Sequence, residues 1–304
     1  MNRIKRLLRS RDFILFLGLA LGLLWGEGAH WTNPLTLPLL ALAMTLSVMG
    51  IPGAIFRTPR LLAGPALSGI AMTYLVLSGL ILTLSFLLIH DKNLWNGFVL
   101  IAAVPPGVAV IPFTLFLNGN RFFSLVGTMG AYLGALIITP LIALSFFGTI
   151  YIHPVKLFII MVELILLPLI VSQFFVRTGA SKWVEPFKGT LTNWSFFVVT
   201  YTIVGLNRQV FLDHPLSLLP AAVIALITTF LLGWTIEGMG RLLRMDSTTV
   251  TSLVLLGTIK NYGLAGGLAL TLFSKDTAVP ATVSTIFMTV YILWLGFKSK
   301  TQRP

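Results

Sequence analysis

The chain contains no cysteine and few charged side chains. Without cysteine it can form no disulfide, no thiolate metal site and no cysteine nucleophile. Charged residues make up 10% of its 304 residues, whereas a soluble domain carries about 25%. Hydrophobic residues make up 56%, and the mean hydropathy is +0.94. This balance predicts an integral membrane protein whose surroundings are the lipid bilayer.

Residue patterns of intramembrane catalysis are also missing. The sequence has no HExxH motif, no paired intramembrane aspartates and no serine–histidine constellation, so we expect no enzyme. Its four histidines lie in or beside predicted outward loops and are not clustered, which argues against a metal site. We expect no cofactor. A channel would be expected to show rings of like charge or a symmetric pore, and neither is visible in the sequence.

Ten apolar runs are present, and they predict an all-α polytopic protein with ten transmembrane helices. The predicted spans are approximately 12–28, 34–56, 62–89, 95–117, 121–147, 156–176, 190–208, 217–240, 248–273 and 277–297. We interpret the first run as a retained span because no small-residue cleavage site follows it.

Lysines and arginines predict the orientation of these spans. Sixteen of the 21 lie in the N-terminal tail, the even-numbered connections or the C-terminal tail, and one, Lys260, lies inside a span. The other side carries only Lys92, Lys156, Arg208 and Lys275. The positive-inside rule therefore predicts a plasma (inner) membrane protein with both termini in the cytoplasm. Basic loops also explain the net charge of +12, and we expect no nucleic-acid partner.

Two of the predicted spans are interrupted near mid-depth. The ninth carries Lys260-Asn261-Tyr262-Gly263, with Lys260 roughly 18 Å from either end of the run at 1.5 Å per helical residue. The fourth carries Pro105-Pro106-Gly107. Prolines remove backbone donors, glycines weaken a helix, and a buried charge needs a partner or a water-filled cavity. Matched breaks of this kind indicate the binding site of a transporter.

The ten spans divide into two sets of five, and an odd number per set makes the sets run in opposite directions. In each half the fourth helix is interrupted and a short polar hairpin precedes the fifth. Thr114 lies just after the first break, as Thr271 lies after the second. We therefore expect two inverted five-helix repeats, 1–148 and 149–304.

These residues resemble the bile acid:sodium symporter family and its bacterial relatives. The resemblance covers nearly the whole chain and is sharpest over 105–140 and 257–280. It implies that the broken fourth and ninth helices cross, with two sodium ions near the crossing. It also implies that spans one, two, six and seven form a panel domain against which a core domain moves.

The sequence departs from that family at the sodium ligands. Where the family's first break reads Pro-Gly-Gly-x-x-Ser-Asn, Val110 and Ile111 replace the serine and asparagine. Where the second break has a glutamate and, four residues on, a glutamine, this chain has Leu256 and Lys260. Sodium prefers oxygen ligands, and a second unit charge 4 Å away would repel it by about 4 kcal/mol at an effective dielectric near 20. We therefore expect both sodium sites to be absent.

Other positions of the family pattern are retained. Asn261 and Gly263 follow Lys260 as they follow the glutamine in the family. The resemblance places the two remaining hydroxyl ligands at Ser124 and Thr128, and it aligns a third-helix glutamine ligand loosely with Thr73. We interpret these three residues as remnants of cation sites.

Three mechanisms remain open for Lys260. It stays charged where a sodium ion would sit, donating to carbonyls of the broken helices; or it titrates and couples transport to protons; or it attracts an anionic substrate. Glu163, the one acid well inside a span, either acts as a proton carrier or lies in an outer aqueous mouth. Asn193, Thr200 and Asn207 share one face of span seven, which either lines the cavity or bonds neighbouring helices.

We expect a secondary transporter that moves a small organic anion by alternating access, without sodium coupling. The expected substrate and coupling residues are Lys260, Asn261, Gly263, Pro105, Pro106, Gly107, Thr114 and Asn193. The alternatives are a sodium-coupled organic anion symporter, as in the family, and a non-transport intramembrane enzyme or sensor.

Overall fold

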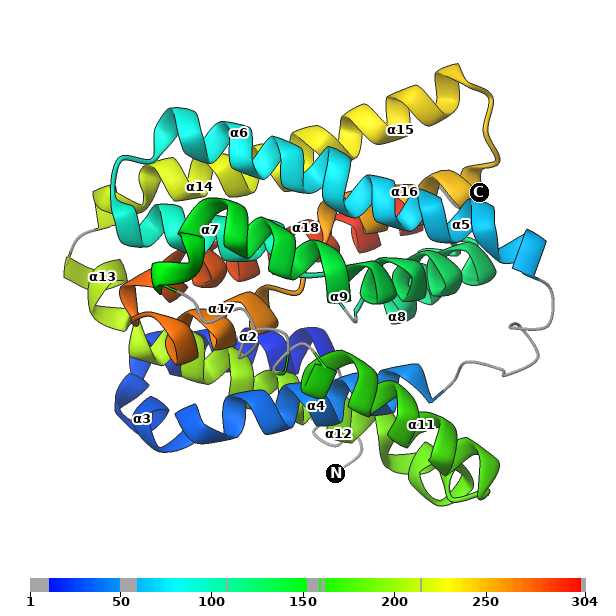
Figure 1. Cartoon of the computed structure of the whole chain (residues 1–304), viewed down its shortest axis with the longest axis horizontal. Helices are drawn as coiled ribbons and strands as arrows, with labels where there is room; N and C mark the ends of the chain where they lie inside the picture. Colours follow the sequence, from blue (N-terminus) through cyan, green and yellow to red (C-terminus); the bar gives the residue numbers. More distant parts are fainter. Residues whose placement is uncertain are drawn as a thin grey trace.

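The computed structural model describes residues 11–49, 59–107, 109–151, 159, 162–213 and 215–301. Within these ranges the regular structure is entirely helical, and the sole β-type pairing is an isolated bridge between Pro106 and Lys260. The all-α prediction is confirmed for this part of the chain (Figure 1).

The helices of the first half begin with α2, before the sharp bend that leads to α3. They are α2 (Arg11–Leu24), α3 (Ala29–Thr32), α4 (Thr36–Val48), α5 (Pro59–Ile70), α6 (Ser78–Leu88), α7 (Lys92–Ala103), α8 (Val110–Phe116) and α9 (Arg121–Tyr151). A π-helical segment, Ala71–Leu77, joins α5 to α6 without a break.

The helices of the second half repeat several of these features. They are α11 (Leu167–Arg177), α12 (Ser181–Leu206), α13 (Arg208–Asp213), α14 (Leu219–Leu226), α15 (Leu232–Leu242), α16 (Ser247–Thr258), α17 (Tyr262–Leu272) and α18 (Val279–Thr301). A second π-helical segment, Ile227–Leu231, joins α14 to α15, and a third, Val162–Leu166, precedes α11.

Four described helices are long and apolar enough to cross a membrane: Leu61–Leu88, Arg121–Phe147, Pro215–Leu242 and Asp276–Lys298. The pair Phe13–Leu24 and Gly26–Leu46, bent by 97°, adds a fifth candidate. The protein is therefore a multi-pass membrane protein. The count of ten spans stays a prediction, and the sixth predicted span, 156–176, lies partly outside the described residues. The helix that contains the predicted seventh span, α12, starts earlier than that span, at Ser181.

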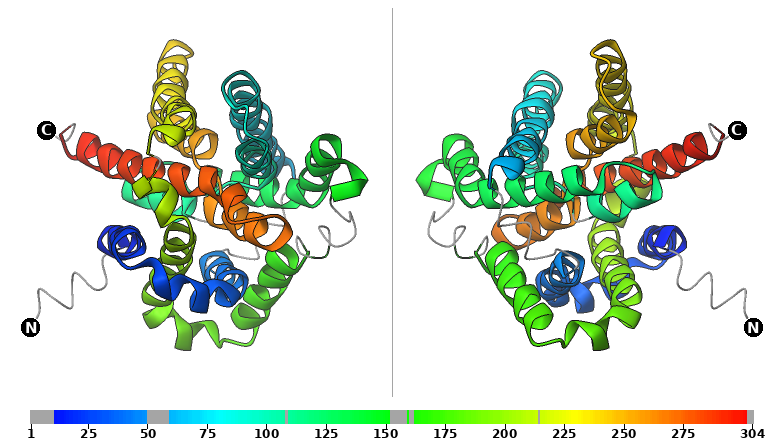
Figure 2. Two further views of the ribbon diagram at one scale, coloured as in Figure 1. Left: turned by 90° about the vertical axis from the view of Figure 1, so that its left-hand side faces the viewer. Right: turned by 90° about the vertical axis from the view of Figure 1, so that its right-hand side faces the viewer.

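The helices form two groups that meet along α17. One group contains α2, α4, α11 and α12, which pack on one another. The other contains the remaining long helices, with α5 against α9, α15 against α16 and α17 against α18. Figure 2 shows the first group below the second, with α17 directly above it. Where α5 crosses α9, a Cβ on Gly69 would lie 2.1 Å from the Gly127 carbonyl oxygen, so the two backbones touch there.

Side-chain caps fix where three of the helices in the second group begin. Asp91 accepts from the Leu94 amide at the start of α7, and Asp246 accepts from the Thr249 amide at the start of α16. Asn261 Oδ1 accepts from the Leu264 amide and caps α17. Each cap satisfies an amide that has no partner inside its own helix.

Candidate functional site

The interrupted spans cross each other through their non-helical segments. After α7 the chain is extended at Val104, and after α16 it is extended at Ile259. The Gly107 amide donates to the Ile259 carbonyl oxygen at 3.1 Å, and the Asn261 amide donates to the Pro105 carbonyl oxygen at 3.0 Å. Pro105 and Pro106 have no amide hydrogen, so the bond from this segment comes from Gly107. Both predicted breaks are confirmed, and the two segments pair with each other. The second break runs from Ile259 to Asn261, so the predicted break residues Tyr262 and Gly263 already belong to α17.

Lys260 reaches from this crossing to the C-terminal end of α7. Its Nζ donates to the Ala102 carbonyl oxygen at 2.9 Å and to the Val104 carbonyl oxygen at 2.7 Å. The last carbonyls of a helix lack partners inside it, and they form the negative end of the helix dipole. The ammonium therefore sits where a positive charge is favoured, although the residue is only 1% exposed.

An aromatic ring completes the surroundings of the ammonium. Lys260 Nζ lies 4.6 Å from the centroid of the Tyr74 ring. In the part of the chain that the structure describes, no carboxylate lies within 4.0 Å of this nitrogen. The nitrogen is therefore held by two carbonyl oxygens and a π face rather than by an ion pair.

The π-helical segment Ala71–Leu77 supports this arrangement. Thr73 Oγ1 donates to the Leu256 carbonyl oxygen at 3.2 Å, and so ties the segment to α16. Ser78 Oγ lies 2.8 Å from the Thr73 carbonyl oxygen and 2.7 Å from that of Ala102, the same oxygen that Lys260 bonds. The sequence identified Thr73 but missed Tyr74 and Ser78, which look like ordinary residues of an apolar run.

Two positions where the resemblance places sodium ligands carry no oxygen atom in their side chains. Val110 and Leu256 are fully buried in one apolar cluster with Phe113 and Ile259, and none of these side chains carries an oxygen. The Thr114 hydroxyl lies 2.7 Å from Ser124 Oγ, which joins α8 to α9. The Thr128 hydroxyl is buried without a hydrogen-bond partner. Val110 and Leu256 therefore offer a sodium ion no side-chain ligand.

A small cavity of about 50 Å³ lies beside the crossing, between the two groups of helices. The side chains of Asn261, Thr200, Thr282 and Thr285 contribute to its lining. Asn261 Nδ2 is buried and has no partner, whereas its Oδ1 caps α17. The lining also includes Gly107, Lys260 and Gly263.

Three of the expected site residues lie elsewhere. Thr114 bonds Ser124 and lines neither this cavity nor the larger one described below. Asn193 is half-buried on α12 and lines neither cavity, although Thr200 on the same face does line the small one. Glu163 is exposed in the segment Val162–Leu166, and its carboxylate does not lie within 4.0 Å of Lys260.

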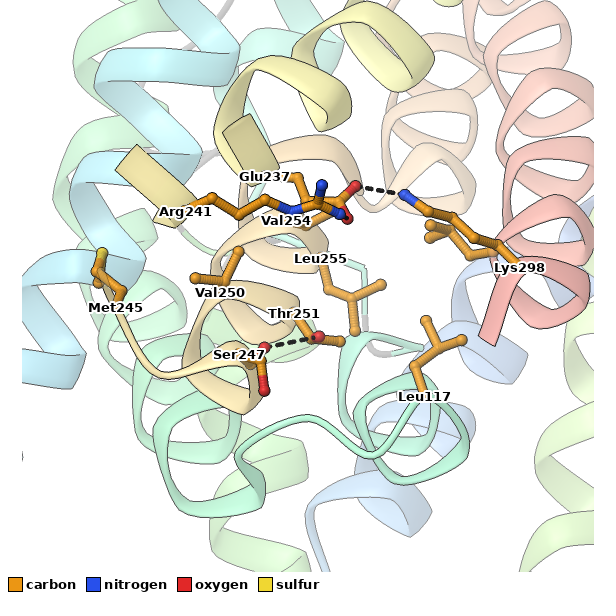
Figure 3. Close-up of a pocket in the computed structure, with 11 residues that line it drawn as sticks. Leu117, Glu237, Arg241, Met245, Ser247, Val250, Thr251, Val254, Leu255 and Lys298 are labelled. Atoms are coloured by element: carbon orange, nitrogen blue, oxygen red, sulfur yellow. Dashed lines mark hydrogen bonds and ion pairs between the residues drawn. The ribbon is translucent and has the colours of Figure 1, made fainter. Parts of the chain in front are cut away.

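A larger cavity of about 270 Å³ lies at the ends of α15 and α18 and the start of α16 (Figure 3). Glu237 accepts from Arg241 and from Lys298, each at 2.5 Å. The pairing of Glu237 with Arg241 follows from their spacing of four residues on one helix. Lys298 could not be found in this way because it comes from α18, 61 positions along the chain.

Comparison with known proteins matches residues 41–294 to the SBF-like CPA transporter family. The chain is 25% identical over 282 residues to the "Probable sodium/metabolite cotransporter BASS1, chloroplastic" of Arabidopsis thaliana, covering 89% of this chain and 68% of that protein. It is 25% identical over 223 residues to the "Uncharacterized sodium-dependent transporter YocS" of Bacillus subtilis (strain 168), covering 72% of this chain and 68% of that protein. The family match spans most of the sequence and includes both broken helices. The chain therefore belongs to the SBF-like CPA transporter family, of the bile acid:sodium symporter type, and is a secondary transporter.

Proposed function

We propose that this transporter moves a small organic anion by alternating access, and that it does so without sodium as a coupling ion. The observation that carries the proposal is the position of Lys260 Nζ, bonded to the Ala102 and Val104 carbonyl oxygens beside the crossing. The ammonium is a resident cation that the protein supplies from its own chain.

The contacts of Lys260 favour the charged form of this side chain. Two carbonyl acceptors, the end of the α7 dipole and the face of Tyr74 each attract a positive charge. A cation that never leaves cannot link transport to an ion gradient. The substrate's own gradient then drives the flux, which makes the carrier an exchanger or a uniporter.

The substrate site lies at the small cavity between the two helix groups. Asn261 Nδ2 is a buried donor without a partner, and Tyr262 and Gly263 at the start of α17 line the same cavity. Together these groups favour a negatively charged ligand group. The cavity of about 50 Å³ is too small for an organic acid. The two helix groups therefore separate to admit the substrate.

That movement fits an architecture of core and panel domains. In the proposal, ten transmembrane helices form two inverted repeats, 1–148 and 149–304, in the plasma membrane with both termini in the cytoplasm. The panel consists of α2, α4, α11 and α12, and the core contains the crossing. The π-helical segments Ala71–Leu77 and Ile227–Leu231 lie in corresponding spans of the two halves and support the repeat.

Sodium-coupled symport is the second candidate. The names of both relatives include sodium. Ser124, Thr128 and Thr73 keep hydroxyl groups at positions where the resemblance places cation ligands, and Thr128 has no hydrogen-bond partner. A sodium ion at these hydroxyls would need other oxygen ligands, because Val110 and Leu256 supply none.

Counterflow in proteoliposomes tests the substrate class. Vesicles loaded with an unlabelled organic acid are diluted into a trace of the labelled acid, across a panel of mono- and dicarboxylates. We expect at least one acid to accumulate transiently, which a channel or an enzyme does not produce. If no anion in the panel exchanges while a neutral or cationic solute does, the organic anion proposal is wrong.

Substitution of Asn261 tests the proposed anion contact. Asn261→Asp keeps an oxygen that caps α17 but removes the Nδ2 donor and adds a negative charge. We expect at least a tenfold higher KM with little change in thermal stability. Asn261→Ser, which also keeps a capping oxygen but adds no charge, is the matched control with a smaller increase. An unchanged KM in Asn261→Asp would show that the substrate does not contact this residue.

A further inference from the structure

The larger cavity is separate from the proposed transport site. It lies at the junction of α15, α16 and α18, and it shares no lining residue with the small cavity at the crossing. Its volume of about 270 Å³ is more than five times that of the smaller one, about 50 Å³. The distribution of lysine and arginine predicts that this end of the molecule faces the cytoplasm.

The charges around this cavity do not balance. Glu237 is one carboxylate with two cationic partners, Arg241 and Lys298, so the group carries one net positive charge. The side chains of Glu237 and Lys298 are only 25% and 26% exposed. Lys298 alone would neutralise the carboxylate, and the Arg241 side chain, which is 68% exposed, adds a second positive charge at the rim of the cavity.

Both cations keep donors that the carboxylate does not use. A guanidinium has five N–H donors and an ammonium has three. Arg241 and Lys298 each make one hydrogen bond to Glu237. Lys298 Nζ also lies 5.2 Å from the Trp294 ring centroid, which helps to hold it in place. Figure 3 shows Arg241 and Lys298 approaching Glu237 from opposite sides at the edge of the cavity.

The remaining walls are mostly apolar. Val250, Val254 and Leu255 of α16 line the cavity, with Leu117 and Leu295 from neighbouring helices. The combination therefore suits a ligand with one anionic head and a short apolar body. A guanidinium matches the paired oxygens of a carboxylate or a phosphate.

We propose that this cavity is a binding site for an oxyanion, a carboxylate or a phosphate, held by Arg241 and Lys298. Glu237 keeps the two cations in position without neutralising both. The oxyanion comes either from a soluble amphipathic acid or from the headgroup of an anionic lipid. This site is independent of substrate transport at the crossing.

Binding to the purified full chain tests the proposal at constant ionic strength. In one arm, hexanoate and inorganic phosphate are titrated by calorimetry into protein in detergent. In the other, thermal unfolding is compared in nanodiscs of phosphatidylglycerol and of phosphatidylcholine. We expect either saturable binding of a soluble anion or a higher unfolding temperature in phosphatidylglycerol. The first result identifies a soluble ligand, and the second identifies a lipid headgroup.

Variants then assign the effect to this cavity. Arg241→Gln and Lys298→Gln should each weaken binding about tenfold to hundredfold, as expected for a lost bond to a charged group. Arg244→Gln, at an exposed arginine that does not line the cavity, is the matched control and should bind as the wild type does. Glu237→Gln should tighten binding because it removes the competing carboxylate, a gain that misfolding cannot imitate. If neither arm shows binding, or if Arg241→Gln and Glu237→Gln both bind as the wild type, the proposal is overturned.

Discussion

At the scale of single residues, Lys260 determines how the crossing is held together. Its ammonium donates to two carbonyl oxygens at the end of α7 and contacts the Tyr74 ring. Three side-chain positions that supply sodium ligands in the family are Val110, Ile111 and Leu256 here. The lysine and these apolar residues agree with the proposal, in which a resident cation makes the missing oxygen ligands unnecessary.

Replacing Lys260 with methionine removes the charge and keeps an unbranched side chain. The Val104 carbonyl then loses its donor, at a cost of about 1–3 kcal/mol for a buried unsatisfied group. We expect counterflow of the identified substrate to fall at least tenfold. Lys275→Met, at an exposed loop lysine, is the control and should leave the rate unchanged. Normal counterflow in Lys260→Met would show that the lysine has only a structural role.

Tyr74 offers a test of the aromatic contact alone. Tyr74→Phe keeps the ring under the ammonium and removes the hydroxyl, which donates to the Ala131 carbonyl oxygen. Tyr74→Leu removes the ring. Since a cation–π contact contributes roughly 0.5–2 kcal/mol, we expect counterflow near the wild-type rate in the phenylalanine variant and several-fold slower counterflow in the leucine variant. Equal rates in the two variants would contradict a role for the ring.

At the scale of elements, α17 presents glycines to the other helix group. A Cβ on Gly266 would lie 2.7 Å from Ile203 Cδ1 of α12, and one on Gly263 would lie 3.2 Å from both Leu40 of α4 and Val199 of α12. We call Gly263, Gly266 and Gly267 the glycine face. It lets α17 lie close to α4 and α12, because no Cβ at these three positions obstructs a sliding movement.

Gly266→Val should hinder that sliding. Its side chain would push into Ile203, and we expect slower counterflow with a smaller change in the unfolding temperature. Gly79→Val is the matched control, because a Cβ at Gly79 meets no atom within 4 Å. The ratio of the two counterflow rates is the measurement. Equal rates would show that α17 and α12 do not move past each other.

The two interrupted spans show which features of the crossing can be predicted from the sequence alone. Prolines, glycines and a charge inside apolar runs are local signals, so the breaks at Pro105–Gly107 and Lys260–Gly263 could be predicted. Donation from Lys260 to carbonyls of the broken helices was one of the possibilities that the sequence offered. The particular oxygens, those of Ala102 and Val104, could not be predicted, because every residue has a backbone carbonyl. Lys298 was missed for a related reason: its contact with Glu237 depends on how α18 packs against α15.

At the scale of the whole molecule, the proposed alternating access requires the two helix groups to move relative to each other. The absence of native cysteine allows a direct test with introduced pairs. A Cβ on Gly267 of α17 would lie 3.1 Å from Leu37 Cδ2 of α4. We expect a short cross-link between Leu37→Cys and Gly267→Cys to stop counterflow, and reductant to restore it.

The control pair lies within one helix group. Ile70→Cys on α5 and Gly134→Cys on α9 are also close, since a Cβ on Gly134 would lie 3.4 Å from Ile70 Cγ1. Cross-linking this pair should leave counterflow intact. Each double variant under reductant serves as its own baseline. If both cross-links act alike, the division into two moving bodies is incorrect.

The central claim is that Lys260 supplies the cation that relatives named for sodium take from solution. Its most direct test is counterflow of the identified anion in proteoliposomes with all sodium replaced by choline on both sides. The account predicts the same rate with and without sodium, and no response to an imposed pH gradient. A response to pH alone would indicate that Lys260 or Glu163 carries a proton. The Glu163→Gln variant distinguishes the two, because it abolishes the response only if Glu163 is the carrier. A rate that collapses without sodium and rises with a sodium gradient would contradict the account.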